Sequence, residues 1–109
     1  SGGFCIVGRE SDLINVAGRK ANPLEIEQVL AQFPGVHEAA VCGVEDPARG
    51  QEICAMVAAN EAPDTLSLRR HCAAHLASWK VPRRFIFVLE IPRNARGKIS
   101  RAETARAFI

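Results

Sequence analysis

Residues 52–59 are apolar on both faces of a predicted strand, and this feature constrains the fold more than any other part of the sequence. A strand of this kind lies inside a sheet, because a strand with one solvated face alternates apolar and polar residues. Residues 36–44 and 84–90 are also predicted to be strands. We therefore expect a small sheet of about three main strands with helices packed against it.

An amphipathic helix is predicted to begin at Pro23, where the missing N–H group of proline carries no cost. Asn22 precedes it and is suited to cap the helix. Pro34-Gly35 is expected to end it. The apolar side chains recur with the spacing of one buried helix face, at Ile26, Val29, Leu30 and Phe33.

A second helix is predicted to run to about Ser78, with either Asp64 or Thr65 as its cap. Residues 101–108 predict a short terminal helix, and residues 4–7 and 13–16 predict a short N-terminal two-stranded element. A chain of 109 residues is long enough for one small domain. The expected fold class is α+β, in a single domain that spans residues 1–109.

Charge is unevenly distributed along the chain, although the formal net charge is only +2. Residues 1–60 hold 4 Lys/Arg and 8 Asp/Glu, whereas residues 61–109 hold 10 and 4. The basic half is suited to an anionic partner such as a nucleotide or CoA, or else forms a solvated basic face. No nucleic-acid partner is expected, because the chain has no Tyr and one Trp to stack on bases. No membrane partner is expected either, since no apolar run reaches the length of a spanning helix.

The four cysteines, Cys5, Cys42, Cys54 and Cys72, form no C-x-x-C pair and lie in apolar segments. They are predicted to be reduced core residues of a cytoplasmic protein. His71 and His75 stand at i, i+4 beside Cys72, a spacing that is compatible with a zinc site. No further ligands with metal spacing accompany them, so no metal site is predicted.

Two glycine-containing charged segments are the strongest functional features. Residues 92–101 read Pro-Arg-Asn-Ala-Arg-Gly-Lys-Ile-Ser-Arg and place Lys98 after Gly97 on a predicted loop. A compact cation in this position can meet a carboxylate or phosphate as charge develops, although a solvated basic loop is the plain alternative. Residues 8–27 read Gly-Arg-Glu-Ser-Asp-Leu-Ile-Asn-Val-Ala-Gly-Arg-Lys-Ala-Asn-Pro-Leu-Glu-Ile-Glu.

These two segments, with Trp79-Lys80-Val81-Pro82 between them, resemble the C-terminal domain of the AMP-forming acyl-CoA synthetases. This family belongs to the adenylate-forming enzymes, and the resemblance covers about residues 4–101. It implies that a carboxylate attacks the α-phosphate of ATP and releases pyrophosphate to form an acyl-adenylate, and that a thiol, usually of CoA, then attacks the acyl carbonyl and expels AMP. ATP and CoA are the implied substrates, with Mg bound outside this domain. The implied partner is an N-terminal domain that holds ATP and the acyl group, so the chain alone is expected to be inactive.

The resemblance also implies roles for individual residues in the adenylation step. Lys98 matches the lysine that stabilises charge during adenylation. Arg9 matches an arginine that contacts the ribose and phosphate of the nucleotide, with a plain surface arginine as the alternative. Lys20 stands where relatives often have an arginine that reaches the nucleotide phosphate, and a lysine there loses the bidentate contact.

A second set of implied roles concerns the thioester step and the rotation between the two steps. Ala17, Gly18 and Arg19 match the loop that lines the pantetheine tunnel of CoA. The pivot of the rotation falls at Ser11, where most relatives carry Asp or Lys. This departure does not prevent a hinge motion, because a hinge only has to absorb changes in φ and ψ, but it puts a charged switch at this position in doubt.

Three further points stay open on the sequence alone. Asn15 and the residues after Gly18 look more like acyl-CoA synthetases than peptide-synthetase adenylation domains, so CoA is favoured and a carrier-protein thiol is the alternative. The residue for the 3′-phosphate of CoA is unassigned, with Arg69 and Arg70 as candidates. The spacing of residues 92–98 also fits recognition by a lysine acetyltransferase, whose acetylation of Lys98 would remove its charge. A further alternative is therefore a substrate module for such an enzyme.

Overall fold

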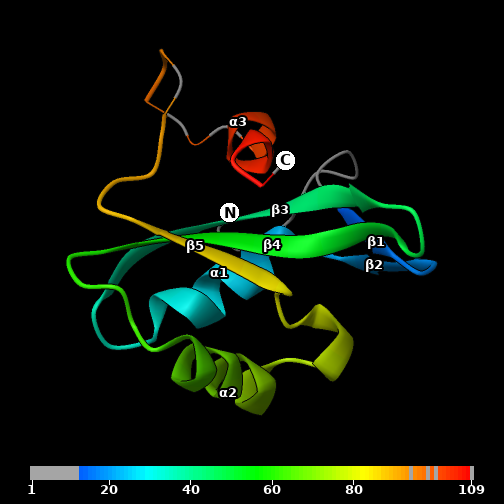
Figure 1. Ribbon diagram of the computed structural model, residues 1–109, viewed down its shortest axis with the longest axis horizontal. Helices are drawn as coiled ribbons and strands as arrows, with labels where there is room; N and C mark the ends of the chain where they lie inside the picture. The colour runs from blue at the N-terminus through cyan, green and yellow to red at the C-terminus, as the bar shows by residue number, and fades with distance from the viewer. Residues whose placement is uncertain (1–12, 94, 98, 100, 109) are drawn as a thin grey trace, which may run out of the picture.

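The computed structural model describes residues 13–93, 95–97, 99 and 101–108, and it has the predicted α+β fold. Five strands form one sheet, in the order β2-β1-β4-β3 with β5 also paired to β4 (Figure 1). Helices α1 and α2 cover one face of this sheet, and α3 lies on the other (Figure 1). The elements are β1 (Ile14–Val16), β2 (Arg19–Ala21), α1 (Pro23–Ala31), β3 (Val36–Asp46), β4 (Gly50–Ala59), α2 (Thr65–His75), the 3₁₀ helix η2 (Ser78–Lys80), β5 (Arg84–Val88) and α3 (Arg101–Arg106).

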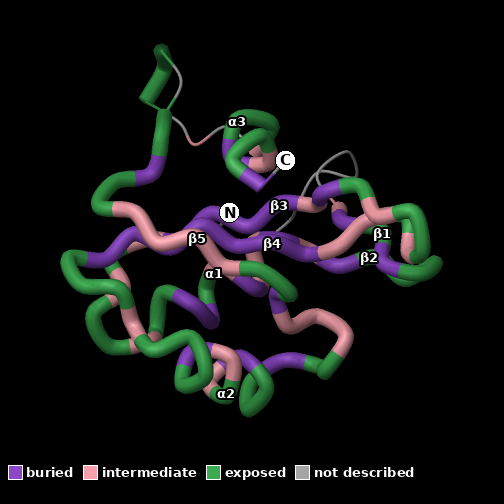
Figure 2. The backbone as a smooth tube through the Cα atoms, in the orientation of Figure 1, coloured by how far each residue is buried: buried purple, intermediate pink, exposed green. Residues whose placement is uncertain are grey.

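Strand β4 is central, as its apolar character predicted, and is buried over most of its length (Figure 2). Alternate side chains of β4 point to opposite faces of the sheet. Ile53, Ala55 and Val57 join the core beneath α1 and α2, whereas Cys54 joins the side that carries Phe108. Both faces of one strand therefore need cover, which explains why helices lie on both sides of so small a sheet.

The two edges of β4 are paired to different extents. Antiparallel β3 pairs with one edge along the whole strand, from Gly50 to Ala59. The opposite edge is shared, because β1 reaches it only at Gly50 and the parallel strand β5 begins pairing only at Cys54. A short stretch of this edge is thus covered by neither strand.

Both predicted helix caps are confirmed. The side chain of Asn22 accepts a hydrogen bond from Leu24 N at 3.0 Å. Asp64, one of the two proposed caps for α2, accepts from Ser67 N at 3.0 Å, and Thr65 is the first residue of the helix. Each cap satisfies a backbone donor that has no partner within its helix.

The end of α2 was predicted too late. The helix stops at His75 because Leu76 takes an extended backbone (φ −130°, ψ 154°) and buries its side chain. The chain then forms the separate turn η2, where Lys80 pairs with Glu25 of α1 at 3.0 Å. Periodicity alone did not reveal this break, because the apolar spacing continues through it.

Other boundaries moved by a few residues. Strand β3 extends to Asp46, and β5 ends at Val88, earlier than predicted. The terminal helix ends at Arg106, and Phe108 is buried just beyond it. Strand β2, which pairs with β1 as a hairpin, was not predicted, whereas the expected strand at residues 4–7 lies outside the described residues.

Three of the predicted core cysteines are buried and form no disulfide, and Cys5 lies outside the described residues. Cys42 and Cys54 stand directly opposite each other on β3 and β4. Burial, with a smaller contribution from Cys54, raises the pKa of the Cys42 thiol to about 12. Burial likewise raises the pKa of Cys72 to about 11. In the described part of the chain no helix is long and apolar enough to cross a membrane.

These pKa shifts predict a loss of stability in alkali. A thiol of the unfolded chain ionises near pH 9, whereas the buried thiols stay protonated, so rising pH favours the unfolded state until the folded pKa is reached. We expect a loss of about 1 kcal/mol per buried thiol by pH 10, measured by urea unfolding between pH 7.5 and 10.5. The Cys42→Ala/Cys72→Ala variant should show a smaller decline. An equal decline in both proteins would contradict the prediction.

Candidate functional site

A groove of about 620 Å³ opens beside the stretch of the β4 edge that neither β1 nor β5 covers. Pro82 helps to keep this stretch open, because proline has no N–H group to extend the β5 ladder toward the start of β4. The first backbone hydrogen bond after Pro82 joins Arg83 N to Ile53 O of β4, at 2.8 Å. The described residues that line the groove come from five segments of the chain: Val16, Ala17, Arg49, Arg69, Ser78, Trp79, Val81, Pro82 and Arg83.

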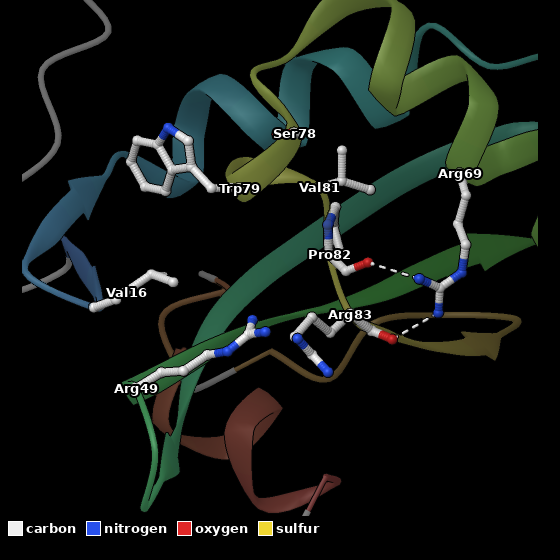
Figure 3. Close-up of a pocket in the computed structure, with 9 residues that line it drawn as sticks. Val16, Arg49, Arg69, Ser78, Trp79, Val81, Pro82 and Arg83 are labelled. Carbon is white, nitrogen blue, oxygen red and sulfur yellow. Dashed lines mark hydrogen bonds between the residues drawn. The ribbon is translucent and has the colours of Figure 1, made fainter.

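The groove is strongly basic. Three arginines and no carboxylate occur among its described lining residues. Arg49 and Arg83 extend toward the same space, while Arg69 approaches from α2 (Figure 3). Arginine is suited to bind phosphate because its planar guanidinium offers paired donors. The groove therefore has the chemistry of a site for a phosphorylated ligand.

Arg69 has a structural task as well as a charge. Its guanidinium donates to the carbonyl oxygens of Arg83 at 2.6 Å and Pro82 at 3.4 Å (Figure 3), and it lies over the ring of Phe85. It thereby ties α2 to the segment that begins β5. Arg70, the other sequence candidate for the 3′-phosphate of CoA, is exposed on α2 and is not among the described residues that line the groove.

Trp79 joins the groove to the β1–β2 hairpin. The guanidinium of Arg19 lies 5.5 Å from the centre of the Trp79 ring, and the Lys80 ammonium lies 5.4 Å from it. Such cation–π contacts each contribute about 0.5–1 kcal/mol at exposed sites. Arg19, predicted to contact CoA, is thus held against a lining residue of the groove.

The Ala17-Gly18 turn lies at the same groove. Both residues have positive φ, 52° at Ala17 and 86° at Gly18, as the tight turn of a two-residue hairpin requires. Ala17 N donates to Arg49 O at 2.8 Å, so the turn is bonded to the β3–β4 turn that carries a groove arginine. The structure therefore brings Ala17, Gly18 and Arg19 together here. Lys20 is exposed on β2, opposite Asn15.

The segment around the predicted adenylation lysine is anchored at both ends. Arg93 forms an isolated antiparallel bridge with Ile99 and an ion pair with Glu38 of β3. Arg101, at the start of α3, pairs with Glu27 of α1 at 3.1 Å, and Glu27 also accepts from Val41 N at 2.8 Å. Lys98 itself, with Arg9 and Ser11, lies outside the described residues.

The two predicted functional segments lie far apart. Residues 95–97 stand at one end of the molecule, and the β1–β2 hairpin stands at the other end (Figure 1). The sequence analysis missed two arginines of the groove, Arg49 and Arg83, and named Trp79 only as part of the motif between the two segments. The only signal of the two arginines was the uneven charge of the chain, because nothing local distinguishes a groove arginine from a surface arginine. Among the described residues no group of three or more His, Cys, Asp or Glu could hold a metal ion.

Comparison with known proteins shows the family of the chain. The model of the family described as AMP-binding enzyme C-terminal domain matches residues 25–98. The chain belongs to this family. It is 46% identical over 102 residues to the sulfoacetate–CoA ligase of Cupriavidus necator, and the aligned region covers 92% of this chain and 20% of that enzyme. It is 39% identical over 99 residues to a 3,4-dihydroxybenzoate–(aryl-carrier protein) ligase of Bacillus anthracis, covering 91% of this chain and 24% of that enzyme.

The fold of the family is also shared with solved structures. The structure of apo MatB from Rhodopseudomonas palustris matches with a TM-score of 0.86 and 32% identity, over 93% of this chain and 21% of that one. The chain thus spans between a fifth and a quarter of the length of these relatives. The resemblance inferred from the sequence to the C-terminal domain of adenylate-forming enzymes is confirmed.

The ion pair between α1 and α3 yields a prediction on stability. Glu27→Ala removes the carboxylate that Arg101 and Val41 N contact in a half-buried position, so we expect a loss of about 2–3 kcal/mol in the free energy of unfolding. Glu25→Ala, two residues away, removes the more exposed pair with Lys80 and should cost below about 1 kcal/mol. Chemical denaturation of both variants measures the difference, and equal costs would refute this assignment.

Proposed function

We propose that residues 1–109 are the mobile C-terminal domain of an ATP-dependent acyl-CoA synthetase, which joins a carboxylic acid to the thiol of CoA. The observation that carries this proposal is the arginine groove beside the Ala17-Gly18 turn. It supports a role for this face in the thioester step. The N-terminal domain is the proposed partner that holds ATP, Mg and the acyl group, so the chain alone is expected to catalyse neither step.

The groove is suited to the nucleotide end of CoA. CoA carries a 3′-phosphate and a diphosphate, and three guanidinium groups surround the groove where such anions can be bound. The turn at Ala17 and Gly18 lies at the rim, where a narrow chain such as pantetheine can pass close to the backbone. In this arrangement the groove holds the phosphates and the turn guides the thiol toward the acyl-adenylate.

The distance between the two functional segments supports a rotation of the domain. A single orientation cannot present both ends of a rigid domain to one reaction centre (Figure 1). One orientation would bring Lys98 to the developing charge of the adenylation step, with Arg9 at the nucleotide, whereas Lys20 on the hairpin at the other end would be presented only in the second orientation. The other would bring the groove and Gly18 to the acyl-adenylate, with the pivot at Ser11.

A carrier-protein thiol is the second candidate, because one relative is named as a ligase for an aryl-carrier protein. A carrier protein presents pantetheine through one phosphodiester and has no 3′-phosphate. A groove with three arginines is better matched to CoA, which has more negative charge. Acetylation of Lys98 stays a prediction from the spacing of residues 92–98.

The proposed CoA groove can be tested in the enzyme that contains this chain. Arg49→Ala and Arg83→Ala should each raise the KM for CoA about tenfold in thioester formation, because each removes a charge-assisted contact. Arg70→Ala, on α2 but outside the groove, should leave this KM unchanged. Dephospho-CoA should bind weakly to the wild type. If CoA is inert and a pantetheine-bearing carrier protein accepts the acyl group, the carrier alternative is correct.

The adenylation role of Lys98 has a separate test. Lys98→Ala should lower carboxylate-dependent ATP–pyrophosphate exchange about 10²- to 10³-fold, because the cation near the reacting oxygens is lost. Transfer to CoA from a supplied acyl-adenylate should persist, since the lysine has moved away in that step. Equal exchange in variant and wild type would show that Lys98 is only a surface residue.

A further inference from the structure

The Ala17-Gly18 turn is held in place by the side chain of Asn15, whose own backbone is bonded to the side chain of Gln51 on β4. Gly18 N donates to Asn15 Oδ1 at 3.1 Å, which closes the turn upon the strand that precedes it. Asn15 N in turn donates to Gln51 Oε1 at 2.9 Å. The backbone of β1 has only one register partner on β4, at Gly50, so the amide of Gln51 takes the place of the next strand contact.

Gly43 on β3 makes the space in which the Gln51 amide lies. A methyl group at position 43 would stand 2.8 Å from Gln51 Nε2, 3.0 Å from Gln51 Cδ and 3.0 Å from Ile14 Cγ2. Real Cβ atoms do not approach other atoms this closely, so a larger residue would displace the flexible end of Gln51. Gly43 lies well inside the β3 ladder, opposite Ile53, so the position favours glycine for its small size.

The turn needs this support because its backbone is not in a favoured state. Ala17 is the one described non-glycine residue with positive φ, a conformation that costs alanine about 1–2 kcal/mol. Outside the hairpin itself, β1 and its turn are held by hydrogen bonds that include Ala17 N to Arg49 O and Asn15 N to Gln51 Oε1. Removal of the second takes away one tie between β1 and β4, while the bond of Ala17 N to Arg49 O in the β3–β4 turn and the register pair at Gly50 remain.

We propose that Gln51 is a positioning residue for thioester formation, and that Gly43 leaves the room that Gln51 needs. Gln51 acts through Asn15, whose backbone it fixes and whose side chain holds Gly18 N. This fixes the turn against the arginine groove, so that the thiol is guided along one path. The inference rests on the proposed function, and it adds a residue to which neither the sequence motifs nor the groove lining assigns a role.

The test compares both half-reactions in the enzyme that contains this chain. Gln51→Ala should lower the maximal rate of acyl transfer from acyl-adenylate to CoA about tenfold, because a small displacement of a guiding loop is costly in rate. ATP–pyrophosphate exchange should not change, and the KM for CoA should change less than twofold, since the groove arginines remain. Gln51→Glu retains an oxygen that accepts from Asn15 N and should restore most of the rate. Gln28→Ala, an exposed glutamine on α1, is the matched control.

A double-variant cycle tests the role of Gly43. Gly43→Ala should reproduce the defect of Gln51→Ala, and adding it to Gln51→Ala should have little further effect, because the displaced amide is already gone. Amide hydrogen exchange of the 109-residue chain tests the bond between Asn15 and Gln51 without an activity assay. Asn15 N–H should exchange faster in Gln51→Ala and at the wild-type rate in Gln51→Glu.

Several results would overturn the inference. It fails if Gln51→Ala transfers the acyl group as fast as the wild type, or if both half-reactions decline together, which would indicate a loss of folding. It also fails if exchange at Asn15 is unchanged. If Gly43→Ala does not fold, the Gln51→Ala and Gln51→Glu variants still test the role of Gln51. A wild-type enzyme that forms no thioester with CoA would instead contradict the proposed function, whatever the exchange data at Asn15 show.

Discussion

Strand β4 is buried on both faces, and the arrangement of every other element follows from the need to cover it. One face is covered by α1 and α2, and the other by α3 with the residues around it (Figure 1). One edge pairs fully with β3, so the remaining strands must share the other. The hydrophobic effect thus determines the layers, whereas the groove arises from the uneven pairing along that second edge.

Two local constraints keep this second edge partly open. Strand β1 ends where the backbone turns at Ala17 and Gly18, and β5 pairs with β4 only after Pro82, which has no N–H group to donate. The stretch between them is bordered by Arg49, Arg69 and Arg83. Arg69 binds two backbone carbonyls, and Arg83 lies 3.8 Å from Glu52, so part of their charge is balanced by the protein. An anionic ligand that enters the groove would complete this balance.

The two proposed functional segments of the domain are supported in different ways. The segment on either side of Lys98 is anchored by ion pairs, Arg93 with Glu38 and Arg101 with Glu27. The Ala17-Gly18 turn is anchored by hydrogen bonds to Arg49 and Asn15, and Asn15 is in turn bonded to Gln51. These supports involve separate residues, so the two proposed half-reactions can be disturbed one at a time. This independence is compatible with the proposed use of the domain in two steps and two orientations.

The sequence by itself determined the fold class, the central place of β4, the Asn22 cap and the family, because each depends on residues close together in the chain, whereas it left Asp64 and Thr65 as alternatives for the second cap. Local patterns can be recognised without a structure, and here they are the apolar periodicity, the capping residues and the two glycine motifs. The end of α2 and the strand β2 were not predicted, because the burial of Leu76 and the pairing of β2 with β1 outweigh what those short segments indicate alone. Only the tertiary structure decided which arginines meet in the groove and that Gln51 supports Asn15 across 36 residues. The physical reason is that these contacts join segments brought together by the burial of β4, and no local preference of the chain encodes them.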